Sequence, residues 1–258
     1  MRRFISAVST AALVIGVVVP SIAFAGAMYP KGKGNIASGK SIFENGKGSV
    51  PACSSCHGSD GMGDDNMGTP RIAGQFAVFL RKQLEDYATD KRKDMTMFVM
   101  NDNAKGLSAQ DRTDVSTYLE SIKPGEKGKM FFAGSDLKEL AANGVEIGTT
   151  AKGKILVEWG KDKGGRGDTT TPIPACRSCH GYNGRGAPPI YPRIGGQRYV
   201  YLVNQLKAWR DGSRNNDSMS QMQIVARNMS DEDIKNAATY LTTASDYSDS
   251  NYYTPYDR

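Results

Sequence analysis

Two short segments contain all four cysteines and both histidines of this 258-residue chain. Cys-Ser-Ser-Cys-His occupies residues 53–57, and Cys-Arg-Ser-Cys-His occupies residues 176–180. Two residues between the cysteines set the thiols at a separation that suits thioether bonds to the two vinyl groups of one haem, and the histidine that follows can ligate the iron. The spacing therefore predicts two covalently bound haem c groups, held by Cys53, Cys56, His57, Cys176, Cys179 and His180.

Zinc binding and disulfide formation are the alternative uses of paired cysteines. A zinc ribbon needs its two cysteine pairs about 15–20 residues apart, whereas 120 residues separate Cys56 from Cys176. Disulfides are natural in an exported protein, but they do not require a histidine after each pair, and the flanking residues show no thioredoxin-like pattern. The two motifs therefore favour haem attachment over both alternatives.

Each iron needs a sixth ligand, and the composition narrows the choice to methionine. Every histidine and cysteine is already used, which excludes bis-histidine and thiolate ligation. Among the 11 methionines, two pairs keep a common offset of 122 residues: Met97 with Met219, and Met100 with Met222. We favour Met100 and Met222, which lie on the approach to the last expected helix of each copy. The other pair stays open as the alternative, since flexible methionines also fill gaps against large apolar surfaces.

The segments around the motifs belong to an internal repeat. Pro-Arg-Ile-Ala-Gly-Gln at 70–75 returns as Pro-Arg-Ile-Gly-Gly-Gln at 192–197, in the same register as the methionine pairs. We therefore expect two homologous domains in tandem, called here the first and second copy. The expected organisation is a first domain at 35–122, a connection at 123–148, a second domain at 149–245 and a tyrosine-rich tail at 246–258.

Helical periodicity predicts the elements that must position these ligands, three helices in each copy. Apolar residues recur at helical spacing through 76–87 in the first copy and 200–209 in the second. Ser108 and Ser230, each followed three residues later by aspartate, are the expected N-caps of a final helix. The segments around the cysteine pairs are rich in Gly, Asp and Pro, so we expect loops there. Alternating strand patterns are absent, and the sequence predicts an all-α fold whose small cores need a cofactor.

The amino terminus has the pattern of a cleaved signal peptide. Arg2 and Arg3 precede an apolar stretch at 11–19, and Ala-Phe-Ala at 23–25 suits a signal peptidase. We expect removal of residues 1–25 and a periplasmic mature chain, with membrane association left open; an uncleaved anchor is the alternative. Cleavage lowers the formal charge of +6 by two, and ionised propionates would offset most of the remainder. The chain has no basic block, so its basic balance gives no indication of nucleic-acid binding.

Together these motifs resemble those of dihaem cytochromes c of the c4 type, which consist of two class I cytochrome c domains in tandem. The resemblance rests on the two Cys-x-x-Cys-His sites, the Pro-Arg-Ile segments, Trp-Arg-Asp-Gly at 209–212 and Met-Ser-Asp-Glu-Asp-Ile at 229–234. It implies two small helical domains, each wrapped around one covalent haem. It also implies that Met222 and, by the repeat, Met100 are axial ligands. Finally, it implies that Arg71 and Arg193 lie near haem propionates, the alternative being ordinary solvated charges.

Ligation by histidine and methionine leaves no open position on the iron and raises its reduction potential, which suits outer-sphere electron transfer. We therefore expect a periplasmic carrier of single electrons between a respiratory donor and a terminal oxidase or reductase. Its expected partners are redox proteins, including a membrane-bound respiratory complex, with no nucleic acid and no small-molecule substrate. The alternative is the dihaem cytochrome subunit of a larger oxidoreductase, such as a flavoprotein sulfide dehydrogenase. We do not expect the chain to be an enzyme, because no spare histidine or cysteine could serve a distal site.

Overall fold

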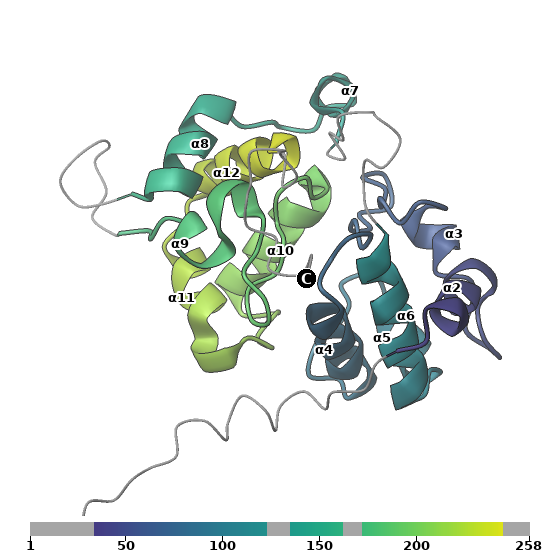
Figure 1. Ribbon diagram of the computed structural model, residues 1–258. Coiled ribbons are helices and arrows are strands. Elements are labelled where there is room, and N and C mark those ends of the chain that lie inside the picture. The colour runs from purple at the N-terminus through teal and green to yellow at the C-terminus, as the bar shows by residue number, and fades with distance from the viewer. Residues whose placement is uncertain (1–33, 123–134, 162–171, 245–258) are drawn as a thin grey trace, which may run out of the picture. The chain divides into compact units, whose positions relative to one another are not determined.

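A computed structural model of the chain describes residues 34–122, 135–161 and 172–244 (Figure 1). These residues form α-helices and short 3-10 turns, and their β-structure is limited to isolated bridges. The predicted all-α fold is therefore confirmed. Within the same ranges, no helix has the length and apolar character needed to cross a membrane. The expected signal peptide and tyrosine-rich tail lie outside the described residues.

The described residues of the first copy form five helices: α2 (Ile36–Asn45), α3 (Ser54–His57), α4 (Ala77–Ala88), α5 (Val99–Lys105) and α6 (Ala109–Ser121). The helix predicted at 76–87 is α4, and the predicted final helix is α6. Ser108 caps α6 through a capping box with Asp111, in which each side chain bonds the other residue's backbone amide. Helices α2, α4 and α6 enclose a core of Ile42, Phe43, Val50, Leu80, Leu107, Val115 and Leu119.

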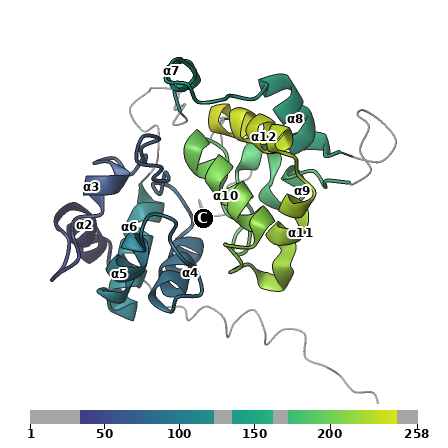
Figure 2. The same ribbon diagram turned by 180° about the vertical axis from the view of Figure 1, so that it is seen from behind.

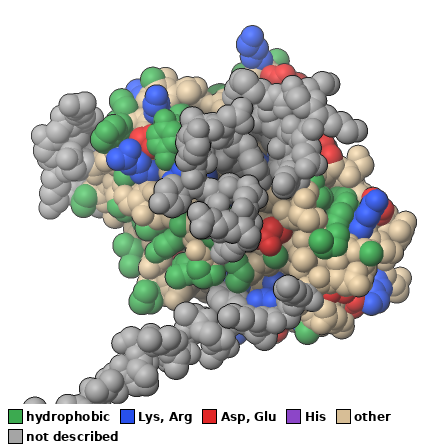
Figure 3. All heavy atoms as spheres, in the orientation of Figure 1, with side chains coloured by type: hydrophobic (Ala, Val, Ile, Leu, Met, Phe, Trp, Pro, Cys, Tyr) green, Lys and Arg blue, Asp and Glu red, His purple; other side chains and the backbone are tan. Residues whose placement is uncertain are grey.

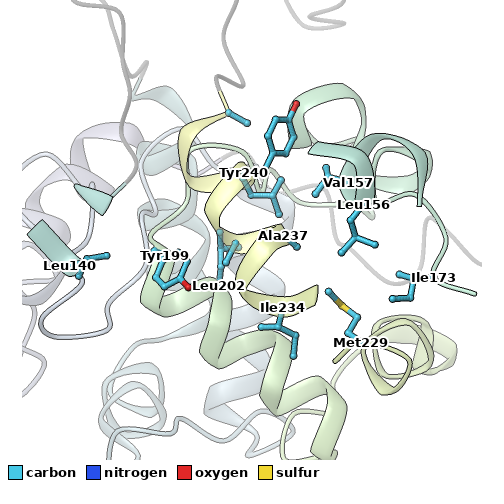
Figure 4. Packing of buried hydrophobic residues seen from close by; sticks show 13 residues of the cluster. Leu140, Leu156, Val157, Ile173, Tyr199, Leu202, Met229, Ile234, Ala237 and Tyr240 are labelled. Carbon is cyan, nitrogen blue, oxygen red and sulfur yellow. The ribbon is translucent and has the colours of Figure 1, made fainter. Parts of the chain in front are cut away.

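The second copy repeats this order of helices. Helices α8 (Thr150–Trp159), α9 (Arg177–His180), α10 (Tyr199–Asp211), α11 (Gln221–Arg227) and α12 (Asp231–Thr243) follow one another, with 3-10 turns η1 (Tyr182–Gly184) and η2 (Ser218–Ser220) between them. Helix α12 packs against α8 and α10, as both views show (Figures 1 and 2). Figure 4 shows the core that these helices enclose, in which Leu156, Tyr199, Leu202, Met229 and Ile234 are buried.

The expectation of three helices in each copy, with loops at the cysteine pairs, was wrong. Both cysteine motifs form a helical turn, α3 and α9, each four residues long. Helices α5 and α11, each seven residues long, were also missed. Such short elements contain too few residues to show a hydrophobic period. The turn matters for the site, because residues at positions i and i+3 of a helix lie on one side of it.

A glycine in each copy allows two helices to approach closely. A Cβ atom on Gly39 of α2 would lie 2.1 Å from the carbonyl oxygen of Asp114 in α6. A Cβ atom on Gly153 of α8 would lie 2.0 Å from the carbonyl oxygen of Asn236 in α12. Any larger side chain would force these helix pairs apart, since backbone atoms cannot give way cheaply.

Part of the expected connection packs against the second copy. Helix α7 (Leu137–Ala142) places Leu140 in the second core. The backbone amide of Ser135 donates to Thr242 Oγ1 at 2.9 Å, and the hydroxyl of Tyr199 donates to the carbonyl oxygen of Glu146 at 2.7 Å. Residues 135–148 are therefore structurally part of the second copy, and 123–134 lie outside the described residues.

Candidate haem sites

Each cysteine motif presents two thiols from one helical turn. Cys53 and Cys176 have helical backbone angles at the starts of α3 and α9, and none of the four cysteines forms a disulfide. Burial raises the pKa of the Cys53 thiol to about 11 and that of Cys176 to about 12. The first thiol of each pair therefore faces an apolar interior, which favours an uncharged thioether over a thiolate.

The two histidines are buried and oriented by the backbone. His57 is 6% exposed and His180 is 8% exposed. Nδ1 of His57 lies 3.0 Å from the carbonyl oxygen of Pro70, and Nδ1 of His180 lies 2.9 Å from that of Pro192. Because a carbonyl oxygen only accepts, Nδ1 carries the hydrogen, and Nε2 keeps the lone pair that an iron ligand needs.

The protonation state of both imidazoles also suits a metal ligand. Burial lowers the pKa of His57 and of His180, so the neutral imidazole is favoured. The Pro-Arg-Ile segments thus orient the iron ligands through the carbonyl oxygens of Pro70 and Pro192. The sequence held a signal for this role, because the two prolines follow the two histidines at nearly the same separation.

The two methionine pairs differ in burial. Met100 in α5 and Met222 in α11 are half-buried, whereas Met97 is 89% exposed and Met219 is 79% exposed. The exposed pair also has positive backbone φ angles, 53° and 56°. Hydrophobic side chains gather over the α11 region on the face shown in Figure 3. The geometry favours Met100 and Met222 as ligands, and their ligation stays a prediction.

A carboxylate anchors the start of each methionine-bearing helix. Asp94 Oδ2 accepts a hydrogen bond from the backbone amide of Met100 at 3.3 Å, and Asp217 Oδ2 accepts one from Met222 at 2.6 Å. The charge of Asp94 also acts on His57, opposing the larger effect of burial on the pKa of that imidazole. The repeat gave no signal for either carboxylate, because the two occupy different positions in it.

Arg71 and Arg193 lie where the two copies meet within one compact unit. Arg71 is 6% exposed; its Nε donates to the carbonyl oxygen of Ala73 at 3.1 Å, and its Nη1 to that of Gly195 at 3.2 Å. The guanidinium of Arg193 lies over the ring of Phe76, 4.6 Å from the ring centre. Each arginine therefore contacts the other copy. Arg71 is not an ordinary solvated charge, and contact with a propionate stays a prediction for both.

Two glutamines connect the same segments reciprocally. Gln75 Nε2 donates to the carbonyl oxygen of Arg193 at 2.8 Å, and Gln75 Oε1 accepts from the backbone amide of Arg193 at 3.0 Å. Gln197 does the same with Arg71, at 2.9 Å and 2.7 Å. Equivalent residues of the two copies therefore make equivalent hydrogen bonds, each to the opposite copy. The sequence repeated both glutamines without revealing that each one bonds the opposite copy.

The donor set of each copy fits a covalently bound haem. Two cysteine side chains extend from one helical turn, and a neutral, buried imidazole has the lone pair of Nε2 available to ligate an iron. A half-buried methionine lies in a short helix whose start bonds an aspartate. This combination of soft and nitrogen donors is the ligand chemistry of an electron-transfer haem.

Comparison with known proteins agrees with this chemistry. The family model described as Cytochrome c matches residues 36–123 and 166–245. The chain is 35% identical over 208 residues to the thiosulfate dehydrogenase electron acceptor of Stutzerimonas stutzeri (strain A1501), an alignment that covers 80% of this chain and 85% of the relative. The chain belongs to the cytochrome c family.

Two solved structures narrow the class. Reduced recombinant cytochrome c4 from Pseudomonas stutzeri matches with a TM-score of 0.59 and 28% identity, covering 82% of this chain and 100% of that chain. Thiosulfate dehydrogenase from Marichromatium purpuratum matches with a TM-score of 0.67 and 30% identity, covering 83% of this chain. This chain spans only 41% of that solved chain. The resemblance to the c4 type is confirmed: the chain contains tandem cytochrome c domains that bind haem covalently and transfer electrons. The domain boundaries at 35–122 and 149–245 stay a prediction.

Proposed function

We propose that the chain carries single electrons on two haems, one in each copy, and accepts them from a thiosulfate-oxidising dehydrogenase. The observation that carries the first part is the pair of buried histidines, His57 and His180, whose Nδ1–H groups are held by carbonyl oxygens. The donor is supported by the relative that is named as the electron acceptor of a thiosulfate dehydrogenase. A terminal oxidase or reductase, as part of a membrane-bound respiratory complex, is the proposed acceptor.

The residues of each copy have separate tasks in this function. A bound c-type haem supplies one-electron chemistry between ferric and ferrous iron. The cysteines of α3 or α9 would hold it by thioether bonds, and the carbonyl oxygen of Pro70 or Pro192 orients the imidazole that would ligate the iron. Met100 and Met222 would supply the second ligand of each iron, and the histidines are buried away from water. A site closed in this way transfers electrons without binding substrate.

The donor is tested by mixing experiments with purified proteins. Oxidised protein with thiosulfate alone should stay oxidised, and a catalytic amount of thiosulfate dehydrogenase should then reduce both haems, followed by visible absorbance. Thiosulfate with the dehydrogenase and a monohaem cytochrome c of similar potential is the control. Equal or faster reduction of the control would contradict a dedicated acceptor, and turnover of thiosulfate by this chain alone would make it an enzyme.

The second candidate is a cytochrome subunit of a larger oxidoreductase, such as a flavoprotein sulfide dehydrogenase. It is favoured by the alignment to the Marichromatium purpuratum enzyme, in which this chain matches only a part of a longer chain. Purification from native extract separates the two candidates. A catalytic protein that stays bound in a one-to-one ratio supports the subunit, and a chain that purifies alone supports the free carrier.

Export and haem content are part of the same proposal. We propose that residues 1–25 direct the chain to the periplasm and are removed there. Intact mass of the purified protein should correspond to a chain that begins after Ala25 and carries two haems. A mass that retains the first 25 residues would contradict cleavage, and one haem per chain would contradict a site in each copy.

A further inference from the structure

One carboxylate of the second copy is buried beside its cysteine motif. Glu158, at the end of α8, is 2% exposed. Its Oε1 accepts a hydrogen bond from the backbone amide of Asn183 at 3.1 Å and lies 3.3 Å from the hydroxyl of Tyr240, which donates to Asn183 Oδ1 at 2.6 Å. Its Oε2 is buried and accepts no hydrogen bond. A buried carboxylate with an unbonded oxygen costs free energy, so such a group is kept where its charge is used.

The charge of Glu158 faces the haem attachment segment. Nη1 of Arg177, which stands between the two cysteines of the motif, lies 3.8 Å from Glu158 Oε2. Asn183, which bonds Glu158 Oε1, follows His180 by three residues. The carboxylate therefore lies close to the atoms that hold the haem of the second copy.

The first copy has no such buried charge at the equivalent place. Glu44 is the counterpart of Glu158, since each follows the close-contact glycine of its helix by five residues. The side chain of Glu44 is 47% exposed and pairs with Lys40 at 3.8 Å. A solvated ion pair of this kind exerts little field on its surroundings.

The residues around these two glutamates explain why only Glu158 is buried. Asn183 of the second copy replaces Asp60 of the first, and a second carboxylate there would repel a buried glutamate. Arg177 replaces Ser54, so only the second copy offers a nearby cation inside the motif. Its guanidinium also lies over the ring of Trp159, 4.6 Å from the centre, which holds it in place.

We propose that Glu158 lowers the reduction potential of the haem in the second copy and that Arg177 partly offsets this effect. The inference rests on the proposed two-haem function. Reduction adds one electron to the iron, and no bond forms or breaks, so a nearby negative charge opposes it and a positive charge favours it. Glu158 is buried and weakly screened, whereas the Arg177 side chain is 40% exposed. The carboxylate therefore has the larger effect.

Each copy also has a carboxylate that bonds the backbone of its expected methionine ligand. Asp94 Oδ2 accepts a hydrogen bond from the backbone amide of Met100 at 3.3 Å, and Asp217 Oδ2 accepts one from that of Met222 at 2.6 Å. Asp94 and Asp217 have the same role in their copies, so Glu158 is an additional, buried carboxylate of the second copy. The proposal therefore concerns the potential of the second haem, measured against its own variants, and not the order of the two potentials.

A redox titration of the full-length protein with both haems tests the proposal, with haem-methyl NMR signals to follow each haem separately. Glu158→Gln keeps the size and the hydrogen-bond acceptor but removes the charge. The equilibrium constant for reducing the second haem should rise about three- to tenfold, which is about 30–60 mV at 59 mV per tenfold change. The constant for the first haem should change less than about twofold. Glu44→Gln, the same change at the exposed counterpart, should leave both haems within that limit.

Arg177→Ser, which restores the residue of the first copy, supplies the opposite test. It should lower the equilibrium constant of the second haem by about two- to threefold, because an exposed charge is partly screened. A structural disturbance would shift the potential of the second haem in the same direction in both variants. The Met-to-iron charge-transfer band checks that methionine ligation is intact. A Glu158→Gln shift below twofold, or shifts of equal sign in the two variants, would overturn the proposal. If Glu158→Gln does not fold, the direction of the shift in the second haem's potential in Arg177→Ser tests the proposal. A wild-type protein with a single haem would contradict the proposed function instead.

Discussion

Replacement of Gln75 by alanine should destabilise both copies, although the residue belongs to the first. Gln75 is 6% exposed. Its side chain accepts hydrogen bonds from the backbone amides of Phe76, at 3.1 Å, and Arg193, at 3.0 Å. It also donates to the carbonyl oxygen of Arg193 at 2.8 Å. Two of these three bonds connect the first copy to the second, so their loss weakens the contact between the copies.

The size of the effect follows from the groups left without a partner. A buried polar group that loses its hydrogen bond costs roughly 1–3 kcal/mol. Arg193 is half-buried, so water replaces part of what is lost there, and we expect a total of about 2–4 kcal/mol. With a denaturant dependence of about 4–6 kcal/mol/M in guanidinium chloride, the unfolding midpoint should fall by roughly 0.3–1 M.

The two tryptophans provide an assay confined to the other copy. Trp159 and Trp209 both lie in the second copy, so their fluorescence reports the unfolding of that copy alone. Far-UV circular dichroism reports the helices of both copies. In Gln75→Ala, both signals should show one transition at the same lowered midpoint. Gln110→Ala is the matched control, because that glutamine lies on the exposed side of α6 and bonds only Asp114 across one helical turn; it should change stability by less than about 0.5 kcal/mol.

An unchanged fluorescence midpoint in Gln75→Ala would refute this reasoning, above all if circular dichroism showed a separate, earlier transition. The copies would then unfold independently, and the bonds between Gln75 and Arg193 would carry no stability. A fall in both midpoints equal to that of the Gln110→Ala control would have the same meaning.

Three further predictions concern the ligands, the caps and the helix contacts. Met100→Ala should remove the Met-to-iron absorbance band of one haem, whereas Met97→Ala should retain both; the reverse result would transfer ligation to the exposed methionine. Burial raises the pKa of Asp233, but the hydrogen bonds from Lys161 and the cap outweigh it and hold that pKa below its ordinary value. The ionised carboxylate therefore stabilises the fold fully above about pH 4, and this contribution is lost as the pH falls through the pKa of the folded state. Asp233→Asn should lower the free energy of unfolding by about 1 kcal/mol at pH 7 and should flatten its decrease below pH 4. Denaturant titrations at each pH measure both effects. Gly153→Ala should destabilise the protein by about 1–3 kcal/mol in the same assay, despite the better helix propensity of alanine.

The parts of the fold that the sequence predicted are determined by local chemistry. The final helices begin at Ser108 and Ser230 because each serine finds its aspartate three residues later, within one turn. Helix α4 likewise follows from an apolar stripe that is readable over three turns. The spacing of the cysteine motif is also local, so five consecutive residues in each copy were enough to indicate the haem chemistry.

The parts that the sequence did not predict depend on residues far apart in the chain. The carbonyl oxygens of Pro70 and Pro192 orient the histidines across a loop, and backbone groups have no identity in a sequence. Gln75 bonds a residue 118 positions away. Glu44 and Glu158 are the same residue at equivalent positions, yet one is exposed and the other buried. Only the neighbours brought close by folding separate these two cases.

The repeat preserves what ligates the iron and varies what surrounds it. Each copy has its own cysteines, histidine, proline that bonds the histidine, and half-buried methionine. The side chains at three other pairs of equivalent positions, 44 with 158, 54 with 177 and 60 with 183, differ between the copies in burial or in charge. Two haems with identical ligands differ in potential only through charge, burial and hydrogen bonding outside the ligand set. A difference in potential is what gives transfer between two haems a direction. Substitutions at these unmatched positions should therefore change the direction or driving force of transfer while both irons keep their ligands, and substitutions at matched positions should change ligation itself.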